Sequence, residues 1–229
     1  MRAYVLHGID DLRLEETALS EIKEREVLVK VMAAGICGSD IPRIYKTGTY
    51  SYPLIPGHEF SGTVIETGLK ADKKWMGKRV GIFPLIPCGE CEPCRKKQYE
   101  MCRHYSYLGS RTNGGFAEYV AVPEENLIEL PEEVSYEVAA MLEPMAVAVH
   151  AMRKSGVMKE NTVVVYGLGT IGLLLCMFLL DAGVRDIYAI GNKEFQKRMA
   201  DSLGISETHY CDCRTREVSK WLQGRTGGR

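Results

Sequence analysis

A strand, a glycine-rich turn and a helix follow one another from residue 162, and this order constrains the fold more than any other feature. The apolar run Thr162–Tyr166 (TVVVY) is typical of a strand buried on both faces of a parallel sheet. A GxGxxG pattern follows it directly and opens a predicted helix over 170–182, which is the setting in which this pattern binds the pyrophosphate of a nicotinamide or flavin dinucleotide. The predicted cofactor-binding residues of this turn are Gly167, Gly169, Thr170, Ile171 and Gly172.

The residues after this helix continue the same alternation. A strand is predicted over 186–190, a helix over 194–203 and a short strand over 208–211. The order β-α-β-α-β predicts a Rossmann-type, doubly wound α/β domain over 151–229. Each βαβ unit needs about 30 residues, so this length holds only about three strands. We therefore expect the first half of such a domain, truncated before its fourth strand.

The tip of the second predicted strand bears on the choice of cofactor. A carboxylate normally stands about 20 residues past the glycines and binds the ribose 2′-hydroxyl of NAD. Here the tip reads Gly191-Asn192-Lys193, with an amide and a cation that would accommodate a 2′-phosphate. Glu194 stands where the next helix begins and would serve its N-terminal dipole. The sequence favours NADP over NAD.

The first part of the chain has a different pattern, because short β-type runs alternate there with Gly and Pro. This pattern predicts a partly open barrel or a sandwich, so the fold class is α/β plus β. A helix is predicted over 136–156, with Pro144 as a kink or restart. We expect a first domain over 1–150. The predicted strands lie at 26–31, 62–68, 79–83 and 116–122.

Four of the eight cysteines lie in one short window: Cys88, Cys91, Cys94 and Cys102. Adjacent CxxC steps let a tight turn direct several thiolates to one centre, which suits tetrahedral Zn²⁺. An iron–sulfur cluster is the competing interpretation. Four sulfur ligands leave no open position, so a zinc ion here would be structural.

Composition narrows the functional classes. The chain is 45% hydrophobic and 26% charged, which is typical of a globular protein, and its net charge is −1. That balance argues against binding of nucleic acid or of an anionic membrane through bulk charge. The longest apolar stretch, 171–180, is half of a bilayer span. The N-terminus lacks the pattern of a secretory or transit signal, so we expect a cytoplasmic protein with reduced cysteines.

Further motifs give the chain a family resemblance. Gly35-Ile-Cys37-Gly-Ser39-Asp40, Gly57-His58-Glu59 and Glu143-Pro144 accompany the four-cysteine window and Gly167-Leu-Gly-Thr-Ile-Gly172. Together they resemble the zinc-dependent medium-chain alcohol dehydrogenase family over the whole chain. The resemblance implies a GroES-like catalytic domain before the Rossmann domain, two zinc ions per chain, and hydride transfer between an alcohol and NAD(P). It also implies a homo-oligomer, a dimer or tetramer, when the protein is full length.

The resemblance assigns roles to individual residues. Ser39 would begin a proton relay, and Asp40 would orient the histidine ligand by fixing its ring tautomer. Glu59 and Glu143 would act in catalysis as alternative or water-mediated ligands. The implied ligands of a catalytic zinc ion are Cys37, His58, Glu59 and Glu143. The implied ligands of a structural zinc ion are Cys88, Cys91, Cys94 and Cys102.

Three segments narrow the expected substrate. These segments resemble the corresponding segments of dehydrogenases that act on polyol phosphates such as galactitol 1-phosphate. They are CGSDIPRIYKTG with its Pro42, the run 84–88 and the run 109–119. Sorbitol, L-iditol and threonine dehydrogenases are the alternatives, and a non-catalytic zinc-stabilised fragment is a further one. A phosphorylated small-molecule substrate needs cationic partners, for which the candidates are Arg43, Lys46 and Arg111.

Overall fold

The computed structural model describes residues 1–19 and 21–228. The chain divides into two compact units, Met1–Glu143 and a second unit that begins at Pro144. No helix among the described residues is both long and apolar enough to cross a membrane.

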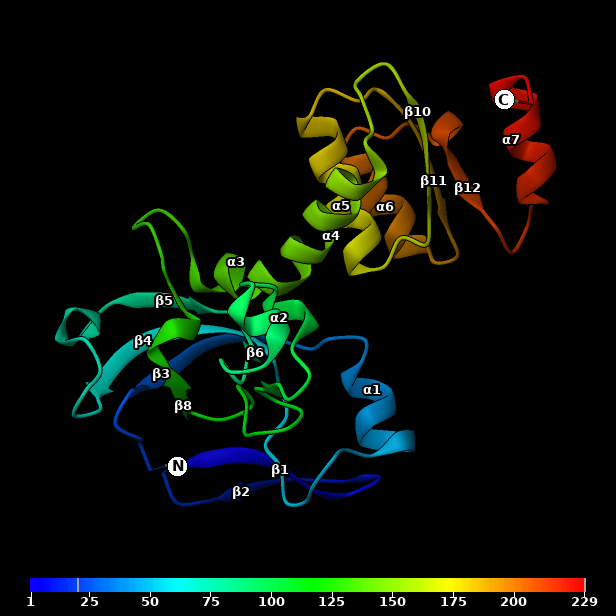
Figure 1. Cartoon of the computed structure of the whole chain (residues 1–229). Coiled ribbons are helices and arrows are strands. Elements are labelled where there is room, and N and C mark those ends of the chain that lie inside the picture. The colour runs from blue at the N-terminus through cyan, green and yellow to red at the C-terminus, as the bar shows by residue number, and fades with distance from the viewer. Residues whose placement is uncertain (20, 229) are drawn as a thin grey trace. The chain divides into compact units, whose positions relative to one another are not determined.

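The first unit is built on an antiparallel five-stranded sheet in the order β8-β3-β4-β5-β9 (Figure 1). Alternating apolar residues of β3 and β4 face a common core, in which Val29 pairs with Val64 across the two strands. Phe60 and Val80 complete the centre of this core and are almost fully buried. The strands are β3 (Glu26–Gly35), β4 (Glu59–Thr67), β5 (Arg79–Ile82), β8 (Tyr119–Pro123) and β9 (Leu127–Glu129).

Smaller elements surround this sheet. The hairpin of β1 (Arg2–Gly8) and β2 (Asp11–Glu16) and the pair β6 (Leu85–Ile86) and β7 (Ser106–Tyr107) are separate two-stranded ladders. The helical elements of this region are α1 (Asp40–Pro42), the following turn Arg43–Thr47, α2 (Glu92–Arg95) and single 3₁₀ turns at Lys73–Trp75, Tyr99–Met101 and Glu124–Asn126.

The predicted helix over 136–156 is two helices, α3 (Tyr136–Ala140) and α4 (Leu142–Ser155). The side chain of Ser135 caps α3 by accepting a hydrogen bond from the amide of Val138. The restart lies at Met141, before the predicted position. Pro144 falls within the first turn of α4, where its missing amide hydrogen breaks no helical bond.

The second unit confirms the predicted β-α-β-α-β order. Its parallel sheet has the order β10-β11-β12, with α5 and α6 on one face and α7 on the other (Figure 1). Alternate residues of β11 serve the two faces, since Ile187 and Ala189 pack with α5 while Tyr188 and Ile190 pack with Trp221 of α7. The elements are β10 (Thr162–Tyr166), α5 (Thr170–Asp181), β11 (Asp186–Gly191), α6 (Glu194–Ser202), a 3₁₀ turn (Glu207–His209), β12 (Tyr210–Asp212) and α7 (Val218–Thr226).

Candidate metal centres and nucleotide-binding turn

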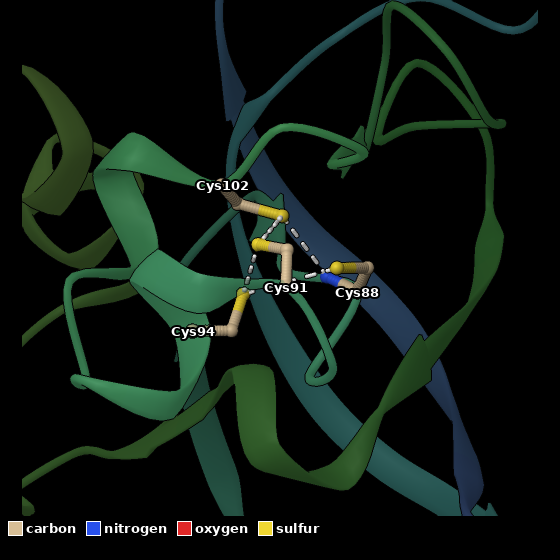
Figure 2. Close-up of side chains that lie close together, drawn as sticks. All are labelled: Cys88, Cys91, Cys94 and Cys102. Atoms are coloured by element: carbon tan, nitrogen blue, oxygen red, sulfur yellow. Dashed lines mark hydrogen bonds between the residues drawn. The ribbon is translucent and has the colours of Figure 1, made fainter.

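The four cysteines of the CxxC window converge on one centre (Figure 2). Cys88 follows β6, Cys91 precedes α2, Cys94 lies within α2, and Cys102 follows the next turn. Their sulfur atoms all lie within 4.8 Å of one another. The Sγ atom of Cys91 is 3.4 Å from that of Cys94 and 3.9 Å from that of Cys102. This donor set fits one tetrahedral ion with four sulfur ligands.

Backbone amides and burial act on these thiols in opposite directions. Hydrogen bonds from the backbone amides of Arg103 and Cys94 lower the pKa of Cys91 to about 6. Burial raises the pKa of Cys94 to about 12. Four sulfurs packed this closely would repel one another as thiolates unless a cation lay between them, so the arrangement favours a bound metal.

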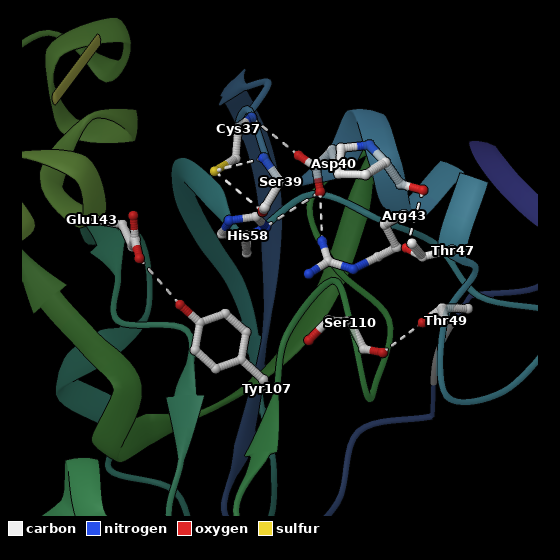
Figure 3. A network of polar contacts seen from close by, with 11 residues as sticks. Cys37, Ser39, Asp40, Arg43, Thr47, Thr49, His58, Tyr107, Ser110 and Glu143 are labelled. Carbon is white, nitrogen blue, oxygen red and sulfur yellow. Dashed lines mark hydrogen bonds and ion pairs between the residues drawn. The ribbon is translucent and has the colours of Figure 1, made fainter. Parts of the chain in front are cut away.

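A second donor group consists of Cys37, His58 and Glu59. Figure 3 shows Cys37 and His58 of this group with their polar neighbours. Cys37 follows β3 and Glu59 begins β4, and the register of the two strands pairs Gly35 with Glu59. One donor atom from each of the three residues lies within 4.8 Å of the others. A Cβ atom at Gly35 would stand 2.6 Å from Oε2 of Glu59, so a larger residue there would displace the carboxylate from its present position.

The environment of this group favours a cation. Burial raises the pKa of the Cys37 thiol and of the Glu59 carboxyl. Both groups would ionise readily beside a metal ion, whose charge offsets the cost of burying them. A thiol, an imidazole and a carboxylate are the donors that zinc uses in open sites. The residues present therefore fit a zinc ion.

Asp40 and Ser39 lie directly beside the second donor group. Asp40 is fully buried, and its Oδ1 atom is 3.5 Å from Nδ1 of His58. This nitrogen has no hydrogen-bond partner among the residues that the structure describes. Its other oxygen, Oδ2, accepts a hydrogen bond of 3.1 Å from the amide of Cys37. The hydroxyl of Ser39 donates to the sulfur of Cys37 at 3.3 Å. Asp40 thus contacts two members of the donor group at once.

Glu143 stands apart from this three-residue group among the described residues. Its Oε1 atom accepts a hydrogen bond of 3.2 Å from the hydroxyl of Tyr107 (Figure 3). The ring of Tyr107 also meets His58 edge to face, at 5.8 Å between centroids. Burial and the nearby charge of Glu143 raise the pKa of Tyr107. Sequence reasoning missed Tyr107, because nothing in the local pattern of β7 marks it.

The three candidate substrate cations lie in different settings. Arg43 begins the turn after α1, and its Nη1 atom is 2.9 Å from Oδ1 of Asp40. Lys46 lies in the same turn. Arg111 is stacked between two rings, with its guanidinium carbon 4.1 Å from the centroid of Tyr50 and 4.3 Å from that of Tyr105.

The glycine-rich turn of the second unit has the geometry that its pattern requires. Gly167 has a φ of +98°, which favours glycine, and its amide donates to the carbonyl of Ile190 at 2.9 Å. A Cβ atom at Gly172 would stand 1.9 Å from the carbonyl oxygen of Gly167. The turn leads into α5, with Gly169 as the residue before Thr170 and Ile171. The start of α5 presents backbone amides to an anion.

The tip of β11 is organised by Gln196 of α6. The Oε1 atom of Gln196 accepts hydrogen bonds from the amides of Asn192 at 2.9 Å and Lys193 at 3.1 Å. A Cβ atom at Gly191 would lie 2.9 Å from that same Oε1 atom and 2.9 Å from the hydroxyl of Tyr210. A larger residue at position 191 would therefore have to displace the ends of the Gln196 and Tyr210 side chains.

Comparisons with known proteins agree with this geometry. Residues 23–132 match the alcohol dehydrogenase GroES-like domain. Galactitol 1-phosphate 5-dehydrogenase of Escherichia coli is 38% identical over 86% of this chain and 57% of its own length. The crystal structure of that enzyme superposes with a TM-score of 0.89 at 35% identity, over 98% of this chain and 64% of its own.

Two relatives from Bacillus subtilis extend the comparison. Sorbitol dehydrogenase is 29% identical over 100% of this chain and 66% of its own length. The structure of 2R,3R-butanediol dehydrogenase is 33% identical, with a TM-score of 0.87 over 99% of this chain and 67% of its own. The chain thus spans between about half and two thirds of each relative. The chain belongs to the zinc-type medium-chain dehydrogenase/reductase family, whose members are NAD(P)-dependent alcohol and polyol dehydrogenases.

Proposed function

We propose that the protein is a zinc-dependent oxidoreductase that transfers a hydride between a secondary hydroxyl of a polyol phosphate and NADP. The observation that carries the proposal is the group of Cys37, His58 and Glu59, in which the hydroxyl of Ser39 lies beside the Cys37 sulfur atom. Family membership and the glycine-rich turn of the second unit support a nicotinamide cofactor as the hydride acceptor.

The two donor groups would have separate roles. Cys88, Cys91, Cys94 and Cys102 fill a tetrahedral shell, so an ion there would be structural. Cys37, His58 and Glu59 supply three ligands and leave a position for substrate. When bound there, Zn²⁺ acts as a Lewis acid that lowers the pKa of the substrate hydroxyl. Glu143 would be a further, alternative ligand.

The protein's own residues would handle the proton and the geometry. Ser39 is exposed, so its hydroxyl can accept the proton of the substrate hydroxyl and pass it to solvent. Asp40 would hold His58 in one tautomer, because a carboxylate beside Nδ1 favours a proton on that nitrogen. Tyr107 would hold Glu143 near this group through its hydroxyl.

The second unit would bind the nucleotide. We assign residues 1–150 to the catalytic domain and 151–229 to the first half of a Rossmann domain. Gly167, Gly169, Thr170, Ile171 and Gly172 would contact the pyrophosphate. Gly191, Asn192 and Lys193 would face the ribose, where the absence of an acid and the presence of a cation favour a 2′-phosphate.

The relatives support the substrate class. The Escherichia coli enzyme at 38% identity is named for galactitol 1-phosphate, and a sorbitol dehydrogenase at 29% identity represents the unphosphorylated alternative. Because the identity to the galactitol 1-phosphate enzyme is higher, we propose a polyol phosphate rather than an unphosphorylated polyol as the substrate. The protein would act on this small molecule as a homo-oligomer.

Cofactor-linked oxidation tests the proposal. The zinc-loaded chain is incubated with NADP or NAD and with galactitol 1-phosphate, sorbitol or threonine, and reduced nicotinamide is followed at its absorbance. We expect galactitol 1-phosphate with NADP to react fastest, and His58→Ala to abolish the signal. If only sorbitol or only threonine were oxidised, that compound's class would replace polyol phosphates as the proposed substrate class. A chain that binds zinc and NADPH but oxidises none of the three would instead be a non-catalytic, zinc-stabilised fragment.

A further inference from the structure

A cavity of about 350 Å³ lies next to the second donor group. Its lining residues are Ser39, Arg43, Thr47, Gly48, Thr49 and Tyr50. Ser39 joins the cavity to the donor group, because its hydroxyl is 3.3 Å from the sulfur of Cys37. A volume of this size is within the range of small-molecule sites. A ligand in this cavity would therefore extend away from the reacting hydroxyl.

The cavity wall carries one cation and no acid among its six lining residues. The cation is Arg43, whose side chain is 21% exposed. An anionic group of a ligand would meet no repelling carboxylate on this wall. The buried charge of Asp40 lies behind Arg43 and is in contact with it. The lining thus offers an anionic ligand one guanidinium and several hydroxyl groups.

Arg43 is held so that part of its guanidinium remains available. Its Nη1 atom donates to Oδ1 of Asp40 at 2.9 Å. Among the residues that the structure describes, its Nε and Nη2 atoms make no hydrogen bond. A guanidinium fixed at one nitrogen presents its remaining donors in a plane, which matches the oxygen atoms of a phosphate.

The turn that begins at Arg43 and the residues that follow it are also fixed in place. The hydroxyl of Thr47 donates to the carbonyl of Pro42 at 3.1 Å, and that of Thr49 donates to the carbonyl of Ser110 at 2.8 Å. Gly48 between them has a φ of +77°, which favours glycine. Each threonine oxygen can still accept a hydrogen bond, as from a protonated phosphate or a substrate hydroxyl.

The other two cations are less suited to this role. The guanidinium of Arg111 is stacked between the rings of Tyr50 and Tyr105, so its two faces are occupied. Lys46 is not part of the cavity lining. Of the three cations considered from the sequence, only Arg43 faces the space beside Ser39.

We propose that Arg43 binds the phosphate group of a phosphorylated polyol in this cavity, with Asp40 as the residue that positions its guanidinium. The assignment rests on the proposed function and gives it a specificity-determining residue. Since Asp40 also contacts His58 and Cys37, one buried carboxylate would orient both the metal-binding group and the phosphate-binding group.

Calorimetric binding tests this assignment without turnover. Galactitol 1-phosphate and galactitol are titrated into the zinc-loaded chain, and the ratio of their affinities measures the contribution of the phosphate. The variants are Arg43→Gln, Arg43→Lys and Arg25→Gln. Arg25 pairs with Glu124 on the same unit and outside the cavity, so its variant is matched in net charge. Zinc content is measured for every variant.

The phosphate should favour binding to the parent chain. We expect Arg43→Gln to reduce the affinity ratio by about 10- to 100-fold, as for loss of a charge-assisted hydrogen bond, and Arg25→Gln to leave it unchanged. Arg43→Lys keeps the charge but not the planar pair of donors, so it should retain part of the preference. This second variant keeps the test decisive if Arg43→Gln loses zinc.

Three results would overturn the assignment. The first is a parent chain that binds both ligands equally, and the second is an equal effect of Arg43→Gln and Arg25→Gln. The third is an Arg43 variant that weakens both ligands by the same factor, which would indicate a purely structural role. Each of these leaves the assignment as a zinc-dependent dehydrogenase standing, because the oxidation assay tests that assignment separately.

Discussion

Oδ1 of Asp40 lies 3.5 Å from Nδ1 of His58, and both side chains are buried. The same oxygen accepts a hydrogen bond from Arg43 at 2.9 Å. A buried carboxylate with no cationic partner would be costly, so Arg43 stabilises it in this position. The ring of His58 thus has the Asp40 carboxylate beside Nδ1. One of its nitrogen atoms also lies within 4.8 Å of the Cys37 sulfur. This relationship makes Asp40 central to the candidate catalytic site.

Replacing Asp40 with asparagine should weaken metal binding at the second donor group. The substitution keeps the size of the side chain but removes the charge that orients the imidazole. We expect an affinity for zinc about 10- to 100-fold lower, measured by competition with a chromophoric chelator. Asp72→Asn is the matched control, since Asp72 caps a 3₁₀ turn and accepts from the amide of Lys74. Equal affinities of the two variants would contradict the role given to Asp40.

Removal of metal from the cysteine group should destabilise the first unit. The Sγ atom of Cys91 contacts those of Cys94 and Cys102, so an ion shared by these sulfurs would cross-link the segment around α2 to Cys102. Without an ion, the segment loses its cross-link and the thiols are left close together. We expect Cys91→Ser to lower the thermal midpoint and to remove one zinc ion per chain. Cys213→Ser, which lies outside both donor groups, should change neither quantity. A Cys91 variant with an unchanged midpoint and full zinc content would refute this role.

The hydrogen bond between Tyr107 and Glu143 should be measurable as a coupling. Tyr107→Phe keeps the ring beside His58 and removes only the hydroxyl, and Glu143→Gln removes the charge of the acceptor. For a bond to a charged group, the two substitutions should couple by about 1.5 to 3 kcal/mol in the free energy of unfolding. A double-mutant cycle by chemical denaturation measures this value. Strictly additive effects would show that the contact contributes nothing.

A carboxylate at position 191 should fail to convert cofactor preference by itself. The Cβ atom of Gly191→Asp would collide with Gln196 and Tyr210, and such overpacking costs about 1 to 3 kcal/mol. We expect this variant to lose NADPH binding without gaining NADH binding, as measured by nucleotide fluorescence. Lys193→Gln should weaken NADPH alone.

The double variant Gly191→Asp/Gln196→Ala distinguishes the two effects at this position. Removing the Gln196 side chain relieves one of the two close contacts, so the double variant should recover part of the lost stability and bind NADH better than the single one. If Gly191→Asp alone binds NADPH as the parent does, the argument for NADP from this position is wrong.

Asp212 gives the stability of the second unit an acid dependence. Hydrogen bonds from the side chain and the amide of Arg214 lower its pKa from 3.8 to about 2. A carboxyl with a depressed folded-state pKa stabilises the fold above pH 4 and loses that contribution as the pH falls towards 2. Asp212→Asn should therefore lose stability at neutral pH and show a shallower decline between pH 4 and 2. Parallel curves for the variant and the parent in urea titrations would contradict this expectation.

The sequence was sufficient for the elements whose pattern is local. The apolar run TVVVY, the glycines after it and the alternation that follows predict β10, α5, β11, α6 and β12 nearly to their bounds. The four cysteines were close together in sequence, so their convergence followed from spacing. Residues of this kind carry their structural information within a few positions of themselves.

Contacts between distant segments required the structure. The pairing of β3 with β4 brings Cys37 to Glu59, and only that register explains Gly35. Tyr107 reaches Glu143 from a two-residue strand that has no periodicity to mark it. Arg43 and Arg111 look alike in sequence as surface cations, yet one contacts a buried acid and the other lies between two tyrosine rings. Such differences depend on packing rather than on residue type.

Metal stoichiometry tests the central claim most directly. We predict two zinc ions per chain in the purified protein. The measurement is elemental mass spectrometry of zinc in the digested protein, divided by the protein concentration. The variants Cys37→Ser/His58→Ala and Cys91→Ser/Cys94→Ser should each retain one ion, since each disrupts one donor group. Fewer than two zinc ions in the parent chain, or loss of the same ion in both variants, would contradict the account of two separate metal sites.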